Sequence, residues 1–191
     1  MFENLKQDTR WLRSIKSKPF PFYVIESLLF ENGYQAVVLH RMAHWFRSRR
    51  IPFVGPFFHR LSMFLTGVDI APAAEIGPGL RISHGVGLVI GAHAKVGADC
   101  LLMHGITLGA PTLERIGDMP TLGDRVVVGA GAKILGGITV GDDVLVGVNT
   151  VVTRDVPANS KVLPPRDLEI VARRSHSSRR AGDEPSEAES S

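Results

Sequence analysis

Two histidines in the middle of the chain have the residue type and the spacing that catalysis would need. His84 occurs in the stretch ISHGVG, and His104 occurs in LMHGITLG. A neutral imidazole accepts a proton near pH 7, which makes histidine a common general base. A lone histidine is more often structural, but two histidines on one face of the fold beside an irregular loop indicate a catalytic site.

A general base needs a partner that fixes its orientation, and Asp69 is the candidate. It lies fifteen residues before His84, which is close to one turn of the coil described below. Alternatively, Asp69 is a turn residue where the coils begin. A metal site built from His84, His93 and His104 is a further possibility, but no carboxylate is interleaved at a suitable position, so the sequence predicts no metal.

An aliphatic residue recurs at every sixth position, and this period predicts the elements that position His84, His104 and Asp69. A helix repeats near 3.6 residues and a strand alternates at 2, so neither alone gives a period of six. A short strand followed by a tight turn does, and three such units form one triangular coil of a parallel β-helix. The sequence therefore predicts a mainly β fold of this kind from about Val68 to Val162. Three runs carry the period: Ile70, Ile76, Ile82 and Leu88; Ile90, Val96, Leu102 and Leu108; Leu122, Val128, Ile134, Val140, Val146 and Val152.

The period is interrupted between Leu108 and Leu122, where two residues are surplus to the six-residue register. The segment APTLERIGDMPT in this interval is expected to project from one coil as a loop. A protrusion on a rigid scaffold is a usual place for functional residues.

The chain divides into three regions. Residues 1–66 are predicted to be helical, with helices over 2–17, over 22–50 with an interruption near Asn32-Gly33, and over 57–65. Residues 67–165 form the coils. Residues 166–191 form a charged tail with few aliphatic residues, which is expected to be disordered.

Composition restricts the class of protein. Hydrophobic residues make up 44% of the 191 residues, enough for a sizeable core, and no apolar stretch approaches the ~20 residues that span a membrane. The charged N-terminus lacks the apolar segment of a signal peptide, and Cys100 is the only cysteine. We therefore expect a cytoplasmic protein without disulfides, in which Cys100 is a small buried hydrophobe.

Positive charge is concentrated in the helical region. Residues 1–60 hold ten Lys or Arg against four Asp or Glu, although the net charge of the chain is only +3. This excess could attract an anionic ligand or a membrane surface, but a solvated helix face is the favoured interpretation. No nucleic-acid motif accompanies the charge.

Several stretches resemble the serine O-acetyltransferase family within the hexapeptide-repeat acyltransferases. They are TGVDIAPAAEIGPGLRISHGVGLVIG, then LLMHGITLGAP, then PTLGDRVVVGAGAKILGGITVGDDVLVGVNTVVTRDVP. With the helical stretch LHRMAHWFR, the resemblance extends over about 160 of the 191 residues.

The resemblance implies a fold, a donor and a set of roles. It implies a left-handed parallel β-helix that assembles as a homotrimer, which can pair into a hexamer, and acetyl-CoA as the acyl donor in the groove between adjacent coil domains. His84 matches the family's catalytic base and Asp69 its carboxylate partner. The backbone at Gly109, Ala130 and Val148 matches segments that line the CoA groove.

Three positions associated in the family with the serine acceptor depart from its pattern. Ser83 stands where the family has an aspartate, Met119 where it has a histidine in the projecting loop, and Lys18 where it has an acidic residue. Two partners for an ammonium group are thereby lost, which suggests acetyl transfer to a changed acceptor. His104 supports this, because a His-Gly at this step is similar to acetyltransferases of exopolysaccharide synthesis, and His104 could replace the missing histidine.

Several functions therefore remain open. The acceptor is L-serine, which would place the enzyme in cysteine biosynthesis, or a sugar hydroxyl of a polysaccharide precursor. A non-catalytic CoA-binding or scaffold homologue would also explain the lost acceptor positions. A hexapeptide-repeat metalloenzyme such as a carbonic anhydrase would need three histidines meeting at a subunit interface.

Overall fold

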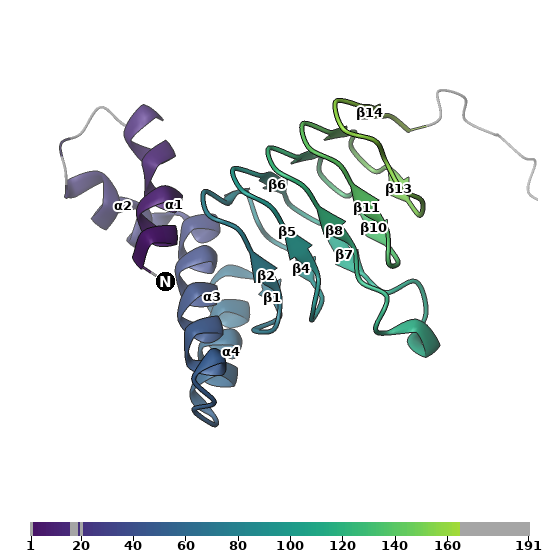
Figure 1. Cartoon of the computed structure of the whole chain (residues 1–191). Coiled ribbons are helices and arrows are strands. Elements are labelled where there is room, and N and C mark those ends of the chain that lie inside the picture. Colours follow the sequence, from purple (N-terminus) through teal and green to yellow (C-terminus); the bar gives the residue numbers. More distant parts are fainter. Residues whose placement is uncertain (1, 16–18, 20, 165–191) are drawn as a thin grey trace, which may run out of the picture.

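A helical region is followed by a stack of β coils (Figure 1). The computed structural model describes residues 2–15, 19 and 21–164. Four helices come first and gather at one end of the stack (Figure 1). Their bounds are α1 Phe2–Ile15, α2 Phe22–Phe30, α3 Asn32–Ser48 and α4 Val54–Thr66.

The coils are built from short strands that pair in parallel with the strands one coil away. Three sheets result, with the orders β1-β4-β7-β10-β13, β2-β5-β8-β11 and β3-β6-β9-β12-β14, over about five turns. The prediction of a left-handed parallel β-helix preceded by helices is confirmed. The strand bounds are β1 Asp69–Ile70, β2 Glu75–Ile76, β3 Arg81–Ser83, β4 Val89–Ile90, β5 Lys95–Val96, β6 Leu101–Met103, β7 Thr107–Gly109, β8 Thr121–Leu122, β9 Val127–Val128, β10 Lys133–Leu135, β11 Thr139–Val140, β12 Leu145–Val146, β13 Val151–Val152 and β14 Lys161–Val162.

The hexad aliphatic residues form the core of the coils. Every residue of the three predicted runs is buried, from Ile70 in the first coil to Val152 in the last. A second inward column lies two residues earlier, as at Val68 and Ala74. Cys100 belongs to this second column and is fully buried, so its prediction as a small buried hydrophobe is confirmed. Burial raises the pKa of the Cys100 thiol to about 11, which keeps the group neutral.

The predicted interruption of the helical region is confirmed, because α2 ends at Phe30 and α3 begins at Asn32. Gly33 lies in the first turn of α3, and a Cβ there would overlap the carbonyl oxygen of Ile82 in the first coil. Glycine therefore allows α3 to approach the coils closely. Helix α4 begins earlier than predicted, since Pro56 is accommodated in its first turn, where the proline's missing N–H costs no hydrogen bond.

A buried ion pair joins the helices to the first coil. Arg41 on α3 donates from Nε to Asp8 Oδ2 at 3.0 Å and from Nη2 to Asp8 Oδ1 at 3.1 Å. The same guanidinium donates to the backbone carbonyls of Ile76 and Gly77, while Asp8 Oδ1 accepts the backbone N–H of Gly79 at 2.8 Å. Both side chains are buried, so α1, α3 and the first coil share one hydrogen-bonded cluster, the Asp8–Arg41 clasp.

Helix α4 buries small residues and exposes aromatic ones. Gly55, Ser62 and Thr66 are buried, whereas Phe57 and Phe64 are exposed. Exposed aromatic residues on one helix face are typical of a surface that another molecule covers. None of the described helices is long and apolar enough to cross a membrane.

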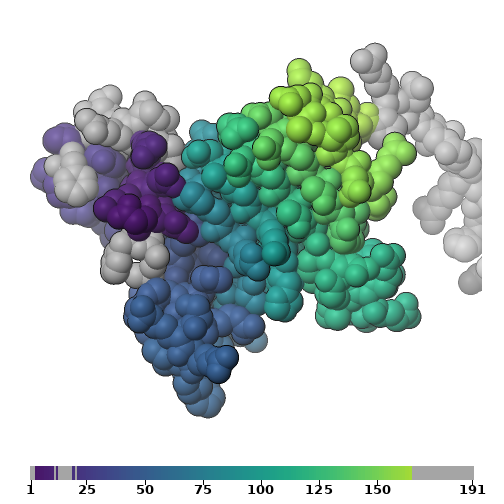
Figure 2. All heavy atoms as spheres, in the orientation of Figure 1, coloured from purple at the N-terminus to yellow at the C-terminus, as the bar shows by residue number. Residues whose placement is uncertain are grey.

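The predicted projecting loop is confirmed between β7 and β8. It contains the short 3-10 helix η1 (Leu113–Arg115) and extends away from the coils (Figure 1). Arg115 and Asp118 form an ion pair within it, with an Nη2–Oδ2 distance of 2.6 Å. In the space-filling view, this loop and the α3–α4 end form two protrusions (Figure 2).

Candidate active site

Four of the predicted site residues form one column along an edge of the coils. His84 follows β3 and His104 follows β6, and the register pairs Ser83 with Met103 directly before them. Ala130 and Val148 continue the column, since the Gly131 amide donates to His104 O and the Asn149 amide donates to Ala130 O. We call this edge, formed by the turns after β3, β6, β9 and β12, the His84 corner. The expectation that His84 and His104 share one face is confirmed.

The turn that carries His84 differs from those stacked on it. Five residues separate β3 from β4, whereas three separate β6 from β7. His84 has a φ of 53°, in the left-handed region that non-glycine residues seldom adopt. The turn is held against the start of the coils, because the Gly87 amide donates to Gly67 O at 2.9 Å. An exposed side chain on strained, well-anchored backbone is typical of functional positions.

Asp69 is hydrogen-bonded to a histidine on a helix. His59 Nε2, on α4, lies 2.7 Å from Asp69 Oδ1. Among the described hydrogen bonds, none joins Asp69 to His84, although the turn of His84 lies against Gly67, two residues before Asp69. The orientation of His84 by Asp69 therefore stays a prediction.

His59 was not predicted from the sequence as a partner of Asp69. The two residues are ten positions apart and lie on different elements. The contact depends on how α4 packs on β1, and neither the six-residue period nor any motif contains that information. His59 is also not fully buried, so it can contact a ligand as well as Asp69.

Other predicted residues lie at a second edge. The turns after β1, β4, β7 and β10 form this edge, which we call the His93 corner. Gly109 ends β7 and leads into it. Met119 stacks one coil above His93, as the pairing of Lys95 with Thr121 requires, and a Cβ on Gly91 would lie 2.9 Å from Met119 Sδ. Within one chain, Met119 and Gly109 therefore lie at a different edge from His84.

Ser83 and Lys18 are the remaining predicted positions. Ser83 ends β3 directly before His84 and is partly buried. Lys18 lies outside the described residues.

The three histidines of the alternative metal site do not lie at one edge. His93 lies at its own corner, on a different edge from His84 and His104. In the part of the chain that the structure describes, no group of three His, Cys, Asp or Glu side chains is arranged to hold a metal ion.

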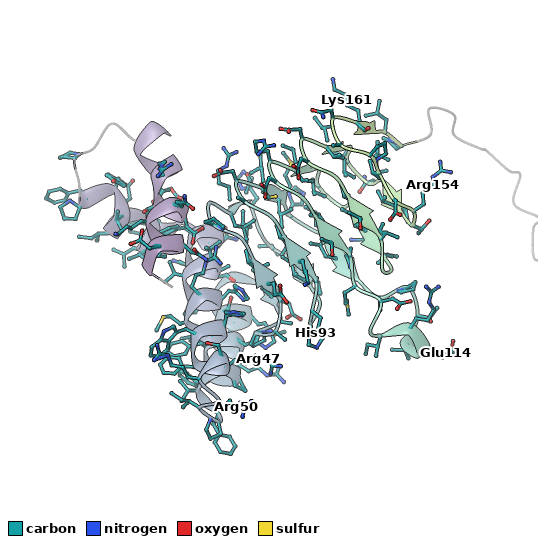
Figure 3. The ribbon with its side chains drawn as sticks, in the orientation of Figure 1. Arg47, Arg50, His93, Glu114, Arg154 and Lys161 are labelled. Carbon is teal, nitrogen blue, oxygen red and sulfur yellow. The ribbon has the colours of Figure 1, made fainter. Side chains whose placement is uncertain are left out.

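The far end of the His84 corner opens into a cavity of about 770 Å³ on the last coil. Asn149, which follows Val148, lines it together with Arg154 and Lys161. Arg154 and Lys161 lie at the end of the coils remote from the helices (Figure 3). The carboxylate of Asp155 also lines the cavity. Arg154 follows β13, so it lies on the last coil at the edge of the His93 corner, and Lys161 begins β14.

Comparisons with known proteins identify the family. Residues 119–154 match the family model described as bacterial transferase hexapeptide (six repeats). The chain is 44% identical to a serine acetyltransferase of Synechococcus elongatus over 163 residues, 85% of this chain and 66% of that one. It is 47% identical to a serine acetyltransferase of Helicobacter pylori over 135 residues, 71% of this chain and 79% of that one.

Solved structures give the same result. A serine acetyltransferase of Brucella abortus in complex with coenzyme A matches with a TM-score of 0.77 and 31% identity, over 86% of this chain and 65% of that one. A serine acetyltransferase of Neisseria gonorrhoeae in complex with serine matches with a TM-score of 0.75 and 30% identity, over 86% of this chain and 67% of that one.

The chain spans just under two thirds of the Synechococcus and Brucella proteins and more of the Helicobacter one. The same family thus accounts for the coils, the helices packed on them and the sequence identity. The chain belongs to the serine acetyltransferase family, which is a family of acyltransferase enzymes.

Proposed function

We propose that this chain is an acetyl-CoA-dependent O-acetyltransferase in which His84 is the general base. The column of His84, His104, Ala130 and Val148 in register along one edge carries the proposal. It provides imidazoles at one end and a continuous backbone edge leading away from them. An extended donor lying on this edge would bring its reactive end to His84.

Charged side chains on the last coil support the proposed position of acetyl-CoA. Acetyl-CoA carries phosphates at the end remote from its thioester. Arg154 and Lys161 line a cavity on the last coil that Asn149, at the end of the column, also lines. The related Brucella abortus structure holds coenzyme A. We infer that the backbone at Ala130 and Val148 lies along the donor.

We further infer a homotrimer, because the candidate residues occupy two edges of each chain. Gly109 and Met119 at the His93 corner would join His84 at the other corner only if two copies met side by side. The exposed Phe57 and Phe64 on α4 supply apolar surface for such contacts. A mass in solution three times the 20.7 kDa of one chain would support the arrangement, and a monomer that retains full activity would contradict it.

In the proposed reaction, one proton moves from the acceptor to His84 and then to the leaving group. His84 accepts the proton of the acceptor hydroxyl as its oxygen forms a bond to the thioester carbonyl carbon. The resulting oxyanion is stabilised by backbone N–H groups. The C–S bond then breaks, the ester forms, and the proton on His84 passes to the departing sulfur of CoA. Asp69 balances the charge on His84 in this scheme, and His104 contacts the acceptor.

L-serine is the first candidate acceptor, since the related Neisseria gonorrhoeae structure is a complex with serine. A sugar hydroxyl is the second candidate. It is favoured by Ser83, which stands where the family has an aspartate and presents no negative charge to an ammonium group. L-serine and a set of sugars should be compared by kcat/KM.

Release of CoA in the presence of acetyl-CoA and each acceptor tests the proposal. His84→Ala should lower kcat by about 10²- to 10⁴-fold, the usual contribution of a general base. Calorimetric binding of CoA should be unchanged, which controls for folding. An unaltered rate in His84→Ala would show that the base lies elsewhere, and absence of CoA binding by the native chain would favour a scaffold protein instead.

A further inference from the structure

A second cleft lies at the other end of the molecule, between the helices and the first two coils. Its volume is about 890 Å³, a size typical of small-molecule sites. The end of α3, the start of α4 and the His93 corner form its walls. None of the residues considered for the donor lines it.

Five of the fifteen residues that line the cleft have basic side chains. Arg47 and Arg50 come from the end of α3 and the following turn, His44 and His59 from α3 and α4, and His93 from the second coil. Arg47, Arg50 and His93 lie near one another at the junction of helices and coils (Figure 3). One carboxylate, Glu75, also lines the cleft, and it forms an exposed ion pair with Lys95 at an Nζ–Oε2 distance of 3.3 Å.

Three of these basic groups are uncommitted. His44 Nδ1 bonds to Pro72 O at 3.0 Å, and His59 bonds to Asp69. The side chains of Arg47, Arg50 and His93 have no hydrogen bond or ion pair among the described residues. Two guanidinium groups and an imidazole with free donors around one cleft match the oxygens of a phosphate group.

The turn between α3 and α4 is strained, and it supplies an apolar wall. Arg50 has a φ of 57° and Phe53 a φ of 64°, in the region that bulky residues avoid. Ile51, Pro52 and Phe53 all line the cleft, and the Phe53 side chain is 85% exposed. The apolar wall beside the cations fits a ligand with a carbon body attached to its anionic group.

We propose that this cleft binds a small organic phosphate, with the phosphate on Arg47, Arg50 and His93 and the carbon body against Ile51, Pro52 and Phe53. The site is connected to the proposed catalytic residues, because His59 lines the cleft and holds Asp69. A ligand in the cleft would therefore lie in the same cavity as the residue that is hydrogen-bonded to Asp69. The site goes beyond the proposed acetyl transfer and does not depend on it.

Calorimetric titration of the full chain with phenyl phosphate, inorganic phosphate and benzoate, at constant ionic strength, tests the proposal. Phenyl phosphate should bind most tightly, since it alone combines the dianion with an aromatic body. Arg47→Gln and Arg50→Gln should each weaken its binding by about tenfold or more, the loss expected for a charge-assisted hydrogen bond. Benzoate binding as tightly as phenyl phosphate would overturn the assignment to phosphates.

Two controls locate the binding. Arg49→Gln removes the same charge from the neighbouring position, but Arg49 packs on the Trp45 ring at 4.0 Å and does not line the cleft, so affinity should be unchanged. The Arg154→Gln, Lys161→Gln double variant should also bind phenyl phosphate normally, and a loss there would move the phosphate to the last coil. His84→Ala should retain phenyl phosphate binding, so that failure of the acetyl-transfer proposal and failure of this one remain distinguishable.

Discussion

Asp69, the first residue of β1, accepts a hydrogen bond from His59 on helix α4. The bond from His59 Nε2 occupies Oδ1 at 2.7 Å. The other carboxylate oxygen has no described hydrogen bond, so it is free to orient His84 in the proposed reaction. One carboxylate would then lie between two imidazoles, and His59 is a positioning residue that acts through Asp69.

Replacing His59 should separate catalysis from binding. His59→Leu removes the donor to Asp69, and we expect kcat to fall by about tenfold or more, because a hydrogen bond to a charged group contributes about 1.5–3 kcal/mol. KM for acetyl-CoA should not change. His59→Gln, whose amide can donate in place of Nε2, should recover much of the rate. Equal rates in the Leu and Gln variants would contradict the positioning role.

At the scale of the elements, the Asp8–Arg41 clasp fixes the helices on the first coil. The Arg41 guanidinium bonds to Asp8 on α1 and to two carbonyls of the first coil. The carboxylate in turn accepts two backbone N–H groups of that coil. Removing one partner would leave a buried charge without compensation, which is more costly than losing both.

Arg41→Met should therefore lower the free energy of unfolding by about 3–5 kcal/mol. The Asp8→Leu, Arg41→Met double variant should lose less than the sum of the two single variants, because it leaves neither charge buried alone. Urea unfolding followed by circular dichroism measures both. Additive losses would mean that the two side chains do not stabilise the fold as a pair.

The elements themselves were largely predictable from the sequence. The six-residue period correctly predicted the coils, since each aliphatic residue of the three runs is buried. Its interruption correctly predicted the projecting loop. The period also slips by two residues between Leu88 and Ile90, which is the signal of the longer turn that carries His84. The extent of α4 was predicted less well, since the helix predicted over 57–65 leaves out Pro56, which lies within the first turn of α4.

The candidate site was predictable only in part, for a physical reason. The hexads set the register of one coil on the next, so the shared edge of His84 and His104, twenty residues apart, follows from sequence spacing, whereas Ala130 and Val148 were predicted from the family resemblance. The contact of His59 with Asp69 and the cationic cleft depend instead on how helices pack on coils. That packing is set by contacts such as Gly33 against Ile82, which no periodic pattern encodes.

At the scale of the whole molecule, stability should depend on pH through His40. This side chain is 3% exposed, and its Nδ1 has no hydrogen-bond partner in the described structure. Burial, with the nearby charge of Arg41, lowers the pKa of His40 to about 3 from its ordinary value of 6.5. The unfolded chain therefore binds a proton between these two pH values and the folded chain does not, so the stability present above pH 6.5 is lost as the pH falls toward 3.

The expected outcome is a lower free energy of unfolding at pH 5.0 than at pH 7.5 for the native chain. His40→Leu should show a smaller decrease over the same interval, because it removes the group that titrates. Urea unfolding at both pH values provides the comparison. An identical decrease in the two proteins would assign the pH dependence to other groups.

The first and the last coil of the stack differ in what covers them. Helices cover the first coil and are fixed to it by the clasp, whereas in the described residues no helix or further strand covers β13 and β14. In a stack where each unit contacts only its neighbours, local opening begins at the less protected end and proceeds unit by unit. Amide hydrogens near Val148 should thus exchange with solvent before those near His84. In the proposed reaction, the end of the coils that binds acetyl-CoA would therefore open and close locally many times, while the end that carries His84 stays folded.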